Sequence, residues 1–218
     1  SDMVKEGFKG SGDYGIVGFG VYNGQTSNKP ELNRTPHVAF RACYPIKVKN
    51  QIIEPAIQAY SGKYTLSSEL ISTDTKVKAD KNYIDQRIAG SFILYPKPFG
   101  IQAEYNFGRG PEFNKKTDSI EVKNLHGGYI TLSYFLPIKK QIIYPYFRAQ
   151  YYKGGKKHEL DARSYEVKEF ELGLEYQPVK QFEFVVAYVY AQRRFEDFKL
   201  QDNYQKGHII RLQAQVNF

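Results

Sequence analysis

The chain has 218 residues, a formal net charge of +8 and a mean hydropathy of -0.55, with 19 tyrosines, 15 phenylalanines and no tryptophan. It contains no run of about 18 apolar residues, which excludes a transmembrane helix. Its length fits one large all-β domain covering residues 1–218, and the single cysteine, Cys43, excludes an internal disulfide.

Apolar and polar side chains alternate along most of the chain, and a period of two predicts strands whose two faces meet different surroundings. The ten predicted strands are, in chain order, 14–22, 37–44, 52–60, 83–95, 99–107, 125–136, 142–152, 165–176, 182–192 and 207–218. A further strand-like segment at 3–10 ends at the turn of Ser11, Gly12 and Asp13. We therefore expect the chain to begin partway into a longer protein.

The connections between the predicted strands alternate in length. Long polar segments follow every odd-numbered strand, at 23–36, 61–82, 108–124, 153–164 and 193–206. Tight turns follow the second, fourth, sixth and eighth strands and are built on Pro45, Pro96 with Pro98, Pro137 and Pro178. Long loops at one rim and short, periplasmic turns at the other are typical of an outer-membrane barrel.

One hairpin occurs twice. The segment 45–55 is echoed by the segment 137–145, four strands later. Such a repeat favours an up-and-down meander over a Greek key. Pro55 and Pro145 fall inside strands of this hairpin, where a proline removes one ladder hydrogen bond, and we expect a β-bulge to absorb each loss.

The final strand gives the clearest alternation, with Ile210 and Leu212 on one side and Arg211 and Gln213 on the other. Aromatic residues gather near both strand ends, as in the interfacial girdles of membrane barrels. They are Tyr44, Tyr95, Phe99, Tyr134, Phe135, Tyr144, Tyr176, Phe182 and Phe218 near the tight turns, and Tyr22, Tyr60, Phe107, Tyr151, Tyr188 and Tyr190 near the long loops. We predict an all-β, antiparallel, up-and-down transmembrane β-barrel of the bacterial outer membrane, its ten strands closing alone or forming part of a larger barrel.

The polar side of this pattern carries charges of both signs. In a dry core each ionised group would need a partner or cost several kcal/mol, whereas a water-filled channel keeps it hydrated. The predicted pore-lining residues are Arg41, Arg87, Arg148, Arg211, Glu104, Glu171, Glu175 and Glu183. These residues predict a porin, a passive channel for small hydrophilic solutes or ions. The alternative is a non-conducting barrel that acts as an anchor or adhesin through its long loops.

Catalytic and nucleic-acid functions find little support. The histidines His37, His126, His158 and His208 lie on different strands and rims, without metal-ligand spacing. His126 and Ser133 are an odd number of residues apart on one strand and so point to opposite faces. We predict no enzyme, no metal and no cofactor. The lysines of the long loops would bind lipopolysaccharide phosphates or attract anions, or would simply form solvated charged loops, and no nucleic-acid partner is expected.

Three segments resemble the phosphate-selective porin O and P family. They are Val17 to Gln25 followed by Asn28, Glu31 and Asn33, then Tyr144 to Tyr152, and the terminal Val216, Asn217 and Phe218, which is similar to the assembly signal of outer-membrane barrels. The resemblance implies an outer-membrane channel, monomeric or homotrimeric, that passes small solutes or anions such as phosphate. Family members have roughly sixteen strands, so the chain resembles the C-terminal part or a shortened relative. The family's constriction loop with its arginine ladder has no recognisable counterpart here.

Overall fold

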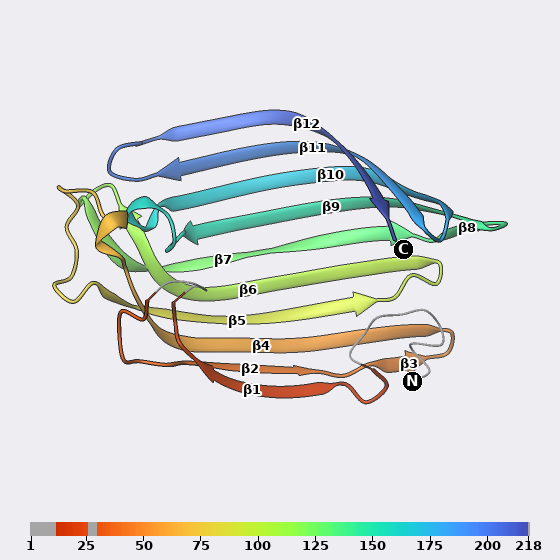
Figure 1. Ribbon diagram of the computed structural model, residues 1–218, viewed down its shortest axis with the longest axis horizontal. Helices are drawn as coiled ribbons and strands as arrows, with labels where there is room; N and C mark the ends of the chain where they lie inside the picture. Colours follow the sequence, from red (N-terminus) through yellow and green to blue (C-terminus); the bar gives the residue numbers. More distant parts are fainter. Residues whose placement is uncertain (1–11, 26–29, 218) are drawn as a thin grey trace.

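A computed structural model describes residues 12–25 and 30–217, so the segment 3–10, Asn28 and Phe218 lie outside the described residues. All described strands belong to one antiparallel sheet of 12 strands (Figure 1). Its long strands follow one another in chain order, β1-β2-β4-β5-β6-β7-β9-β10-β11-β12, and the short β3 and β8 pair with β4 and β9. The predicted all-β antiparallel meander is confirmed.

The strands are β1 (Ile16–Tyr22), β2 (His37–Cys43), β3 (Ile46–Val48), β4 (Gln51–Thr65), β5 (Asn82–Leu94), β6 (Phe99–Asn114), β7 (Ser119–Tyr134), β8 (Leu136–Ile138), β9 (Gln141–Gly155), β10 (Ser164–Val179), β11 (Phe182–Glu196) and β12 (Asn203–Val216). Two single-turn helices, η1 (Ser68–Leu70) and η2 (Leu160–Ala162), lie in long loops. Within the described chain no helix has the length and apolar character needed to cross a membrane. Each of the ten predicted strands matches a long strand.

The two repeated hairpins explain why β3 and β8 count as separate strands. β2 and β3 pair with β4 in one unchanged register, and the break between them lies opposite Pro55. β7 and β8 pair with β9 in the same way, with the break opposite Pro145. The predicted bulges are therefore wrong. The ladder loses the bonds that a proline nitrogen cannot donate and resumes without shifting.

The segment 108–124 is not the long loop that the sequence predicts. β6 and β7 stay paired from Phe99↔Tyr134 to Asn114↔Ser119, which leaves a turn of four residues. Pro111 falls within this hairpin, at a point where the ladder between β5 and β6 has already ended at Arg109. Beyond that point β6 is free of pairing on the β5 side, and such an edge tolerates proline.

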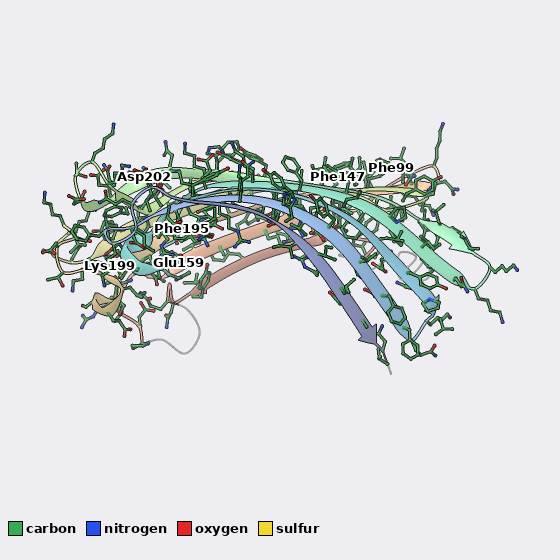
Figure 2. All side chains as sticks on the ribbon, turned by 90° about the horizontal axis from the view of Figure 1, so that it is seen from above. Phe99, Phe147, Glu159, Phe195, Lys199 and Asp202 are labelled. Atoms are coloured by element: carbon green, nitrogen blue, oxygen red, sulfur yellow. The ribbon has the colours of Figure 1, made fainter. Side chains whose placement is uncertain are left out.

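The sheet is bent into an arch, with Phe99 and Phe147 along its convex side and the loop that carries Glu159 beneath it (Figure 2). We call the side of Phe147 and Leu172 the outer face and the side of Arg148 and Glu171 the inner face. β1 and β12 form the two edges, and within the described residues they do not pair with each other. The arch has the curvature of a barrel wall.

The outer face is apolar and exposed. Leu172 is 63% exposed, Ile210 74% and Leu212 77%. Because directly opposite residues of an antiparallel ladder point to the same side, the register joins Leu172 to Phe147 on β9 and Tyr188 on β11. A continuous band of exposed aliphatic and aromatic side chains, much larger than the apolar patches of soluble monomers, indicates a surface that is covered by something apolar.

The two aromatic bands are only partly on this outer face. Phe107, Tyr151, Tyr188, Tyr190, Tyr44, Phe99, Tyr134, Tyr176 and Phe182 have the parity of the outer face. Five rings assigned to the bands have the parity of the inner face instead, namely Tyr22, Tyr60, Tyr95, Phe135 and Tyr144. The sequence correctly placed these rings near the strand ends. Which face each ring occupies depends on its parity along the strand, which the assignment to bands did not consider.

Buried apolar side chains form small clusters at the two ends of the sheet. Tyr64, Leu66, Tyr83, Ile120 and Ala162 pack together beneath the long loops, and Ile52 packs with Tyr95 near the tight turns. Among the described residues the middle of the inner face carries many polar side chains beside small buried residues such as Ala89, Ala187 and Val189, where a soluble barrel would place a packed core of large apolar side chains.

Candidate functional site on the inner face

The sheet register brings the eight predicted pore-lining residues to one face. Arg41 lies opposite Gln58, Arg148 opposite Glu171, and Ala187 opposite Arg211, and stepping by two along each strand reaches the others. By this parity Arg41, Arg87, Arg148, Arg211, Glu104, Glu171, Glu175 and Glu183 all point to the inner face.

A polar chain crosses the first half of the inner face. Arg41 Nη1 donates to Gln58 Oε1 at 3.0 Å, and Gln58 Nε2 donates to Glu104 Oε2 at 2.6 Å. The first bond joins β2 to β4. The second joins β4 to β6 and passes over β5, where Ala89 is buried and small enough to leave room. Beside this chain lies a hollow of about 330 Å³ lined in part by Gln58, Glu104 and Arg87.

A second polar group lies on the other half of the sheet. The Tyr146 hydroxyl donates to Glu171 at 2.7 Å, and Arg211 Nη1 lies 3.5 Å from the same carboxylate. Arg148 instead stacks over the Tyr129 ring at 4.9 Å, a cation–π contact. Gly173 lets the Tyr146 ring lie flat against the sheet, since a Cβ at this position would collide with that ring.

Glu175 and Glu183 lie nearer the tight turns and stay apart from the arginines. Glu175 accepts a hydrogen bond from Gln177 at 2.6 Å. In the part of the chain that the structure describes, neither carboxylate forms an ion pair with any of the four predicted arginines. Of the four arginines and four glutamates, only two pairs therefore come together. Arg211 lies against Glu171, and Arg41 is linked to Glu104 through Gln58.

The most elaborate polar cluster surrounds Asp85, which is fully buried. The Tyr60 hydroxyl donates to both of its carboxylate oxygens, at 3.0 and 3.1 Å. Lys157 forms an ion pair with it, and Arg87 Nε lies 3.9 Å away. Alternation predicts that Asp85 points inward, but nothing in the sequence indicates its main partner, because Lys157 lies 72 positions further along the chain.

Lys157 belongs to the loop 156–163 between β9 and β10, and this loop projects across the inner face. Its contacts are on β4 and β5, so it passes over β7 and β6 to reach them. His158 Nδ1 lies 3.1 Å from the Tyr64 hydroxyl, and Lys157 lies 4.7 Å from the Tyr64 ring centre. A hollow of about 440 Å³ remains, with Arg87, Lys157 and His158 among its lining residues.

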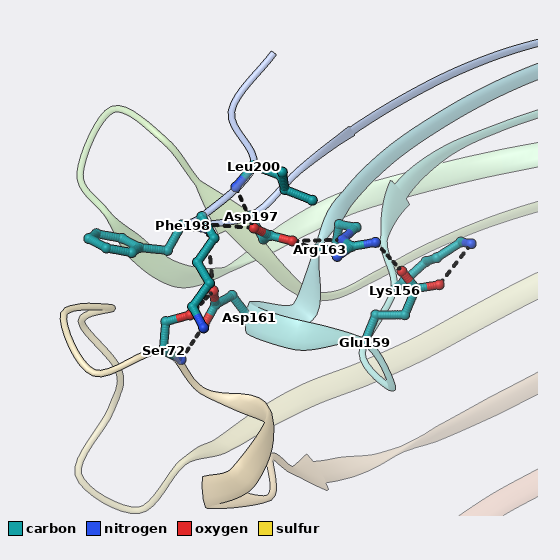
Figure 3. A network of polar contacts seen from close by, with 9 residues as sticks. Ser72, Lys156, Glu159, Asp161, Arg163, Asp197, Phe198 and Leu200 are labelled. Carbon is teal, nitrogen blue, oxygen red and sulfur yellow. Dashed lines mark hydrogen bonds and ion pairs between the residues drawn. The ribbon is translucent and has the colours of Figure 1, made fainter. Parts of the chain in front are cut away.

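Two buried carboxylates hold this loop in place (Figure 3). Asp161 accepts hydrogen bonds from the backbone N–H and the hydroxyl of Ser72, at 2.7 and 2.8 Å, and from the Phe198 N–H at 3.3 Å. It therefore joins the β4–β5 loop, the β9–β10 loop and the β11–β12 loop. Bonds to a charged acceptor contribute about 1.5–3 kcal/mol each, so the loops are tied together as one unit.

Asp197 is the second anchor and is also fully buried. Arg163 donates to one of its oxygens from Nε at 2.9 Å and from Nη2 at 2.6 Å. The other oxygen accepts the backbone N–H groups of Lys199 at 2.9 Å and Leu200 at 2.7 Å (Figure 3). Arg163 is thus fixed at the base of the loop whose tip carries Lys157.

The packing of His158 makes the loop sensitive to pH. Burial lowers the pKa of this imidazole, and the neighbouring Lys157 and Arg87 lower it further while Asp85 opposes them. A released loop would protonate near the ordinary value of about 6.5, whereas the packed loop stays neutral below it. Acid therefore favours release, and packing is fully present only above the ordinary pKa.

We expect trypsin to cleave after Lys156 or Lys157 faster at pH 5.5 than at pH 7.5 once its own pH dependence is normalised on an unfolded peptide. Released backbone is the preferred target of proteases. In the variant His158→Gln, whose side chain cannot titrate, the normalised rates at the two pH values should be equal. A pH dependence that persists unchanged in this variant would rule out His158 as its source.

No group of three or more potential metal ligands occurs among the described residues. Comparisons with known proteins add one positive finding. The family model described as phosphate-selective porin O and P matches residues 1–218, the whole chain. No curated protein and no solved structure matches.

Proposed function

The chain belongs to the phosphate-selective porin O and P family of outer-membrane porins, and from this membership we propose that it is a passive diffusion channel for small hydrophilic solutes and ions, anions such as phosphate among them. The sheet is the channel wall, its outer face meeting lipid and its inner face meeting water. The long loops are extracellular and the tight turns periplasmic, as in other barrels with this division of loop lengths.

One observation carries the proposal, namely the contrast between the two faces of a single sheet. Ile210 and Leu212 are about three-quarters exposed on the outer face, while Arg211 between them points to the inner face and approaches Glu171. In water such an apolar surface would drive aggregation. Against acyl chains it is favourable, and the charges opposite remain hydrated in a lumen.

The mouth at the long loops would select among the solutes. Arg87, Lys156, Lys157 and Glu159 line the hollow beneath the loop 156–163, and the buried Asp85 pairs with Lys157. A narrow passage with low-dielectric walls focuses the field of such charges. Their balance favours anions at the entrance, and the carboxylates lower on the wall keep the channel from being strictly anion-selective.

The outer face also suggests the lipid partners. Its apolar band lies against membrane lipid, and Lys115, Lys116 and Lys153 lie toward the long-loop rim, where lipopolysaccharide phosphates would lie. Lys115 already pairs with the exposed Asp202 at 2.5 Å, so Lys116 and Lys153, which form no ion pair among the described residues, carry more of the attraction than Lys115 does.

Conductance of the refolded protein in planar bilayers tests the proposal. We expect discrete channel steps, and in a salt gradient the variant Arg148→Glu should shift the reversal potential toward cation preference. A change of two charge units about 6 Å from the ion path in water is worth about 1.4 kcal/mol, or roughly a tenfold change in permeability ratio.

Arg109→Glu is the matched control, because Arg109 lies on the outer face, where it donates to Gln86 at 2.8 Å. This charge reversal should leave the reversal potential unchanged. An equal shift in both variants would remove Arg148 from the pore wall. Absence of channel steps in the parent protein would instead favour the non-conducting anchor or adhesin.

A further inference from the structure

The four tight turns themselves carry only positive charges, and the carboxylates on the adjoining strand ends, Glu54, Glu175 and Glu183, point to the inner face. The segments 44–50, 95–98, 135–140 and 177–181 contain no aspartate or glutamate. Their lysines are Lys47, Lys49, Lys97, Lys139, Lys140 and Lys180. At the opposite rim the long loops mix acids and bases, as in the pairs of Lys156 with Glu159 and of Arg163 with Asp197. The two rims therefore differ in chemistry as well as in length.

Two of these turns extend the sheet as the hairpins that contain β3 and β8, the repeated motif of the sequence. Every residue of both short strands is exposed, and the β8 hairpin reaches the far end of the molecule (Figure 1). Ile46, Val48, Leu136 and Ile138 are 39–50% exposed. By register they continue the outer face, so the apolar surface runs down to the hairpin tips.

The lysines at these tips occupy costly backbone positions. Lys49 has a φ of 54° and Lys139 a φ of 57°, a left-handed conformation that glycine and asparagine adopt most easily at hairpin turns. Both hairpins place a lysine there, directly after an exposed aliphatic residue. Because a lysine occupies this left-handed position in both hairpins, where glycine or asparagine would be less strained, we infer that its positive charge has a function.

We propose that the two hairpin tips bind the headgroups of anionic phospholipids in the leaflet on the tight-turn side. The aliphatic side chains would enter the acyl boundary while Lys49, Lys139 and Lys140 extend to the phosphates, as long basic side chains do at membrane interfaces. A soluble acidic polymer would satisfy the lysines but would leave Ile138 and Val48 in water. The inference rests on the membrane-embedded wall of the proposed function but not on conduction.

Fluorescence can test the proposal cleanly because the chain has no tryptophan. The variant Ile138→Trp carries a single reporter at one tip, and the protein is refolded into bilayers of phosphatidylcholine and phosphatidylglycerol. We expect brominated phosphatidylglycerol to quench this reporter at least twofold more than brominated phosphatidylcholine at the same mole fraction. Adding Lys139→Gln and Lys140→Gln, or raising the salt to 1 M, should abolish the difference.

Leu172→Trp in the middle of the outer face is the matched reporter and should be quenched equally by both lipids. Equal quenching at Ile138→Trp would overturn the proposal, as would no quenching by either lipid, the result expected if the tip meets only soluble partners. Channel steps measured on the Lys139→Gln, Lys140→Gln protein keep the two hypotheses separate. Conduction with no lipid preference refutes the headgroup surface alone, and lipid preference without conduction refutes the channel alone.

Discussion

Replacement of Leu172 by arginine is expected to destabilise the folded protein in a bilayer by about 2–4 kcal/mol, although the leucine side chain is 63% exposed. An exposed leucine in a water-soluble sheet could be exchanged for arginine at little cost. Here Leu172 lies halfway along the outer face, where a guanidinium would have to be buried in hydrocarbon. The free energy of unfolding by denaturant in lipid vesicles measures the effect.

Gln213→Arg supplies the comparison, since Gln213 has the parity of the inner face and lies opposite Val185 on β11. In a water-filled lumen this substitution should cost less than about 0.5 kcal/mol. A ratio of costs near one between Leu172→Arg and Gln213→Arg would mean that both faces meet the same solvent. That result would contradict the assignment of the outer face to lipid.

Side-chain parity made most of the sheet predictable from sequence. A shift of one residue moves every side chain to the other face, so the alternation around Arg148 or Glu171 determines both strand and orientation. All ten predicted strands and the common face of the eight candidate residues follow from this rule. Strand ends were less predictable, because β4, β6 and β10 extend further into polar sequence than their apolar residues indicate.

The polar ends of these strands are stable without an apolar face because their side chains form hydrogen bonds with neighbouring segments. Glu112 on β6 accepts a hydrogen bond from the Ser164 hydroxyl at 2.7 Å, and Glu121 accepts one from Asn114 at 2.9 Å. These bonds satisfy groups that hydropathy alone would assign to solvent. For Pro55 and Pro145 the sequence predicted more disruption than the structure shows. Each proline interrupts the ladder, but the register is the same on both sides of it.

The loop contacts could not be predicted from sequence. The ion pair of Asp85 with Lys157 joins residues 72 positions apart, and the bonds of Asp161 with Ser72 join residues 89 positions apart. Periodicity describes what a strand presents to each side but carries no information on which distant loop folds over it. The sequence therefore contains no sign that the Lys156-Lys157-His158 run packs over the inner face, where Lys157 pairs with Asp85 and His158 lies beside Tyr64.

Replacement of Asp85 by asparagine is expected to release the loop 156–163 from the inner face and to increase single-channel conductance. The asparagine keeps the shape and can still accept a hydrogen bond from Tyr60, but Lys157, whose side chain is 13% exposed, loses its counter-charge. Removing one partner of a buried ion pair costs about 3–5 kcal/mol. A loop can avoid this cost by moving into water, so the wall should stay folded while Lys157 becomes accessible to trypsin.

Two further variants separate this mechanism from general destabilisation. Asp202→Asn removes the acid of an exposed pair, in which the Lys115 and Asp202 side chains are 37% and 72% exposed, and it should change neither conductance nor cleavage, because exposed pairs contribute about 0–1 kcal/mol. Adding Lys157→Met to Asp85→Asn removes the uncompensated cation as well and should restore much of the packed loop. Cleavage is compared at Lys156, the site that both variants keep. If the double variant is cleaved after Lys156 as fast as Asp85→Asn alone, the charge on Lys157 is not what drives the loop away, and the loop is held chiefly by Asp161 and Asp197.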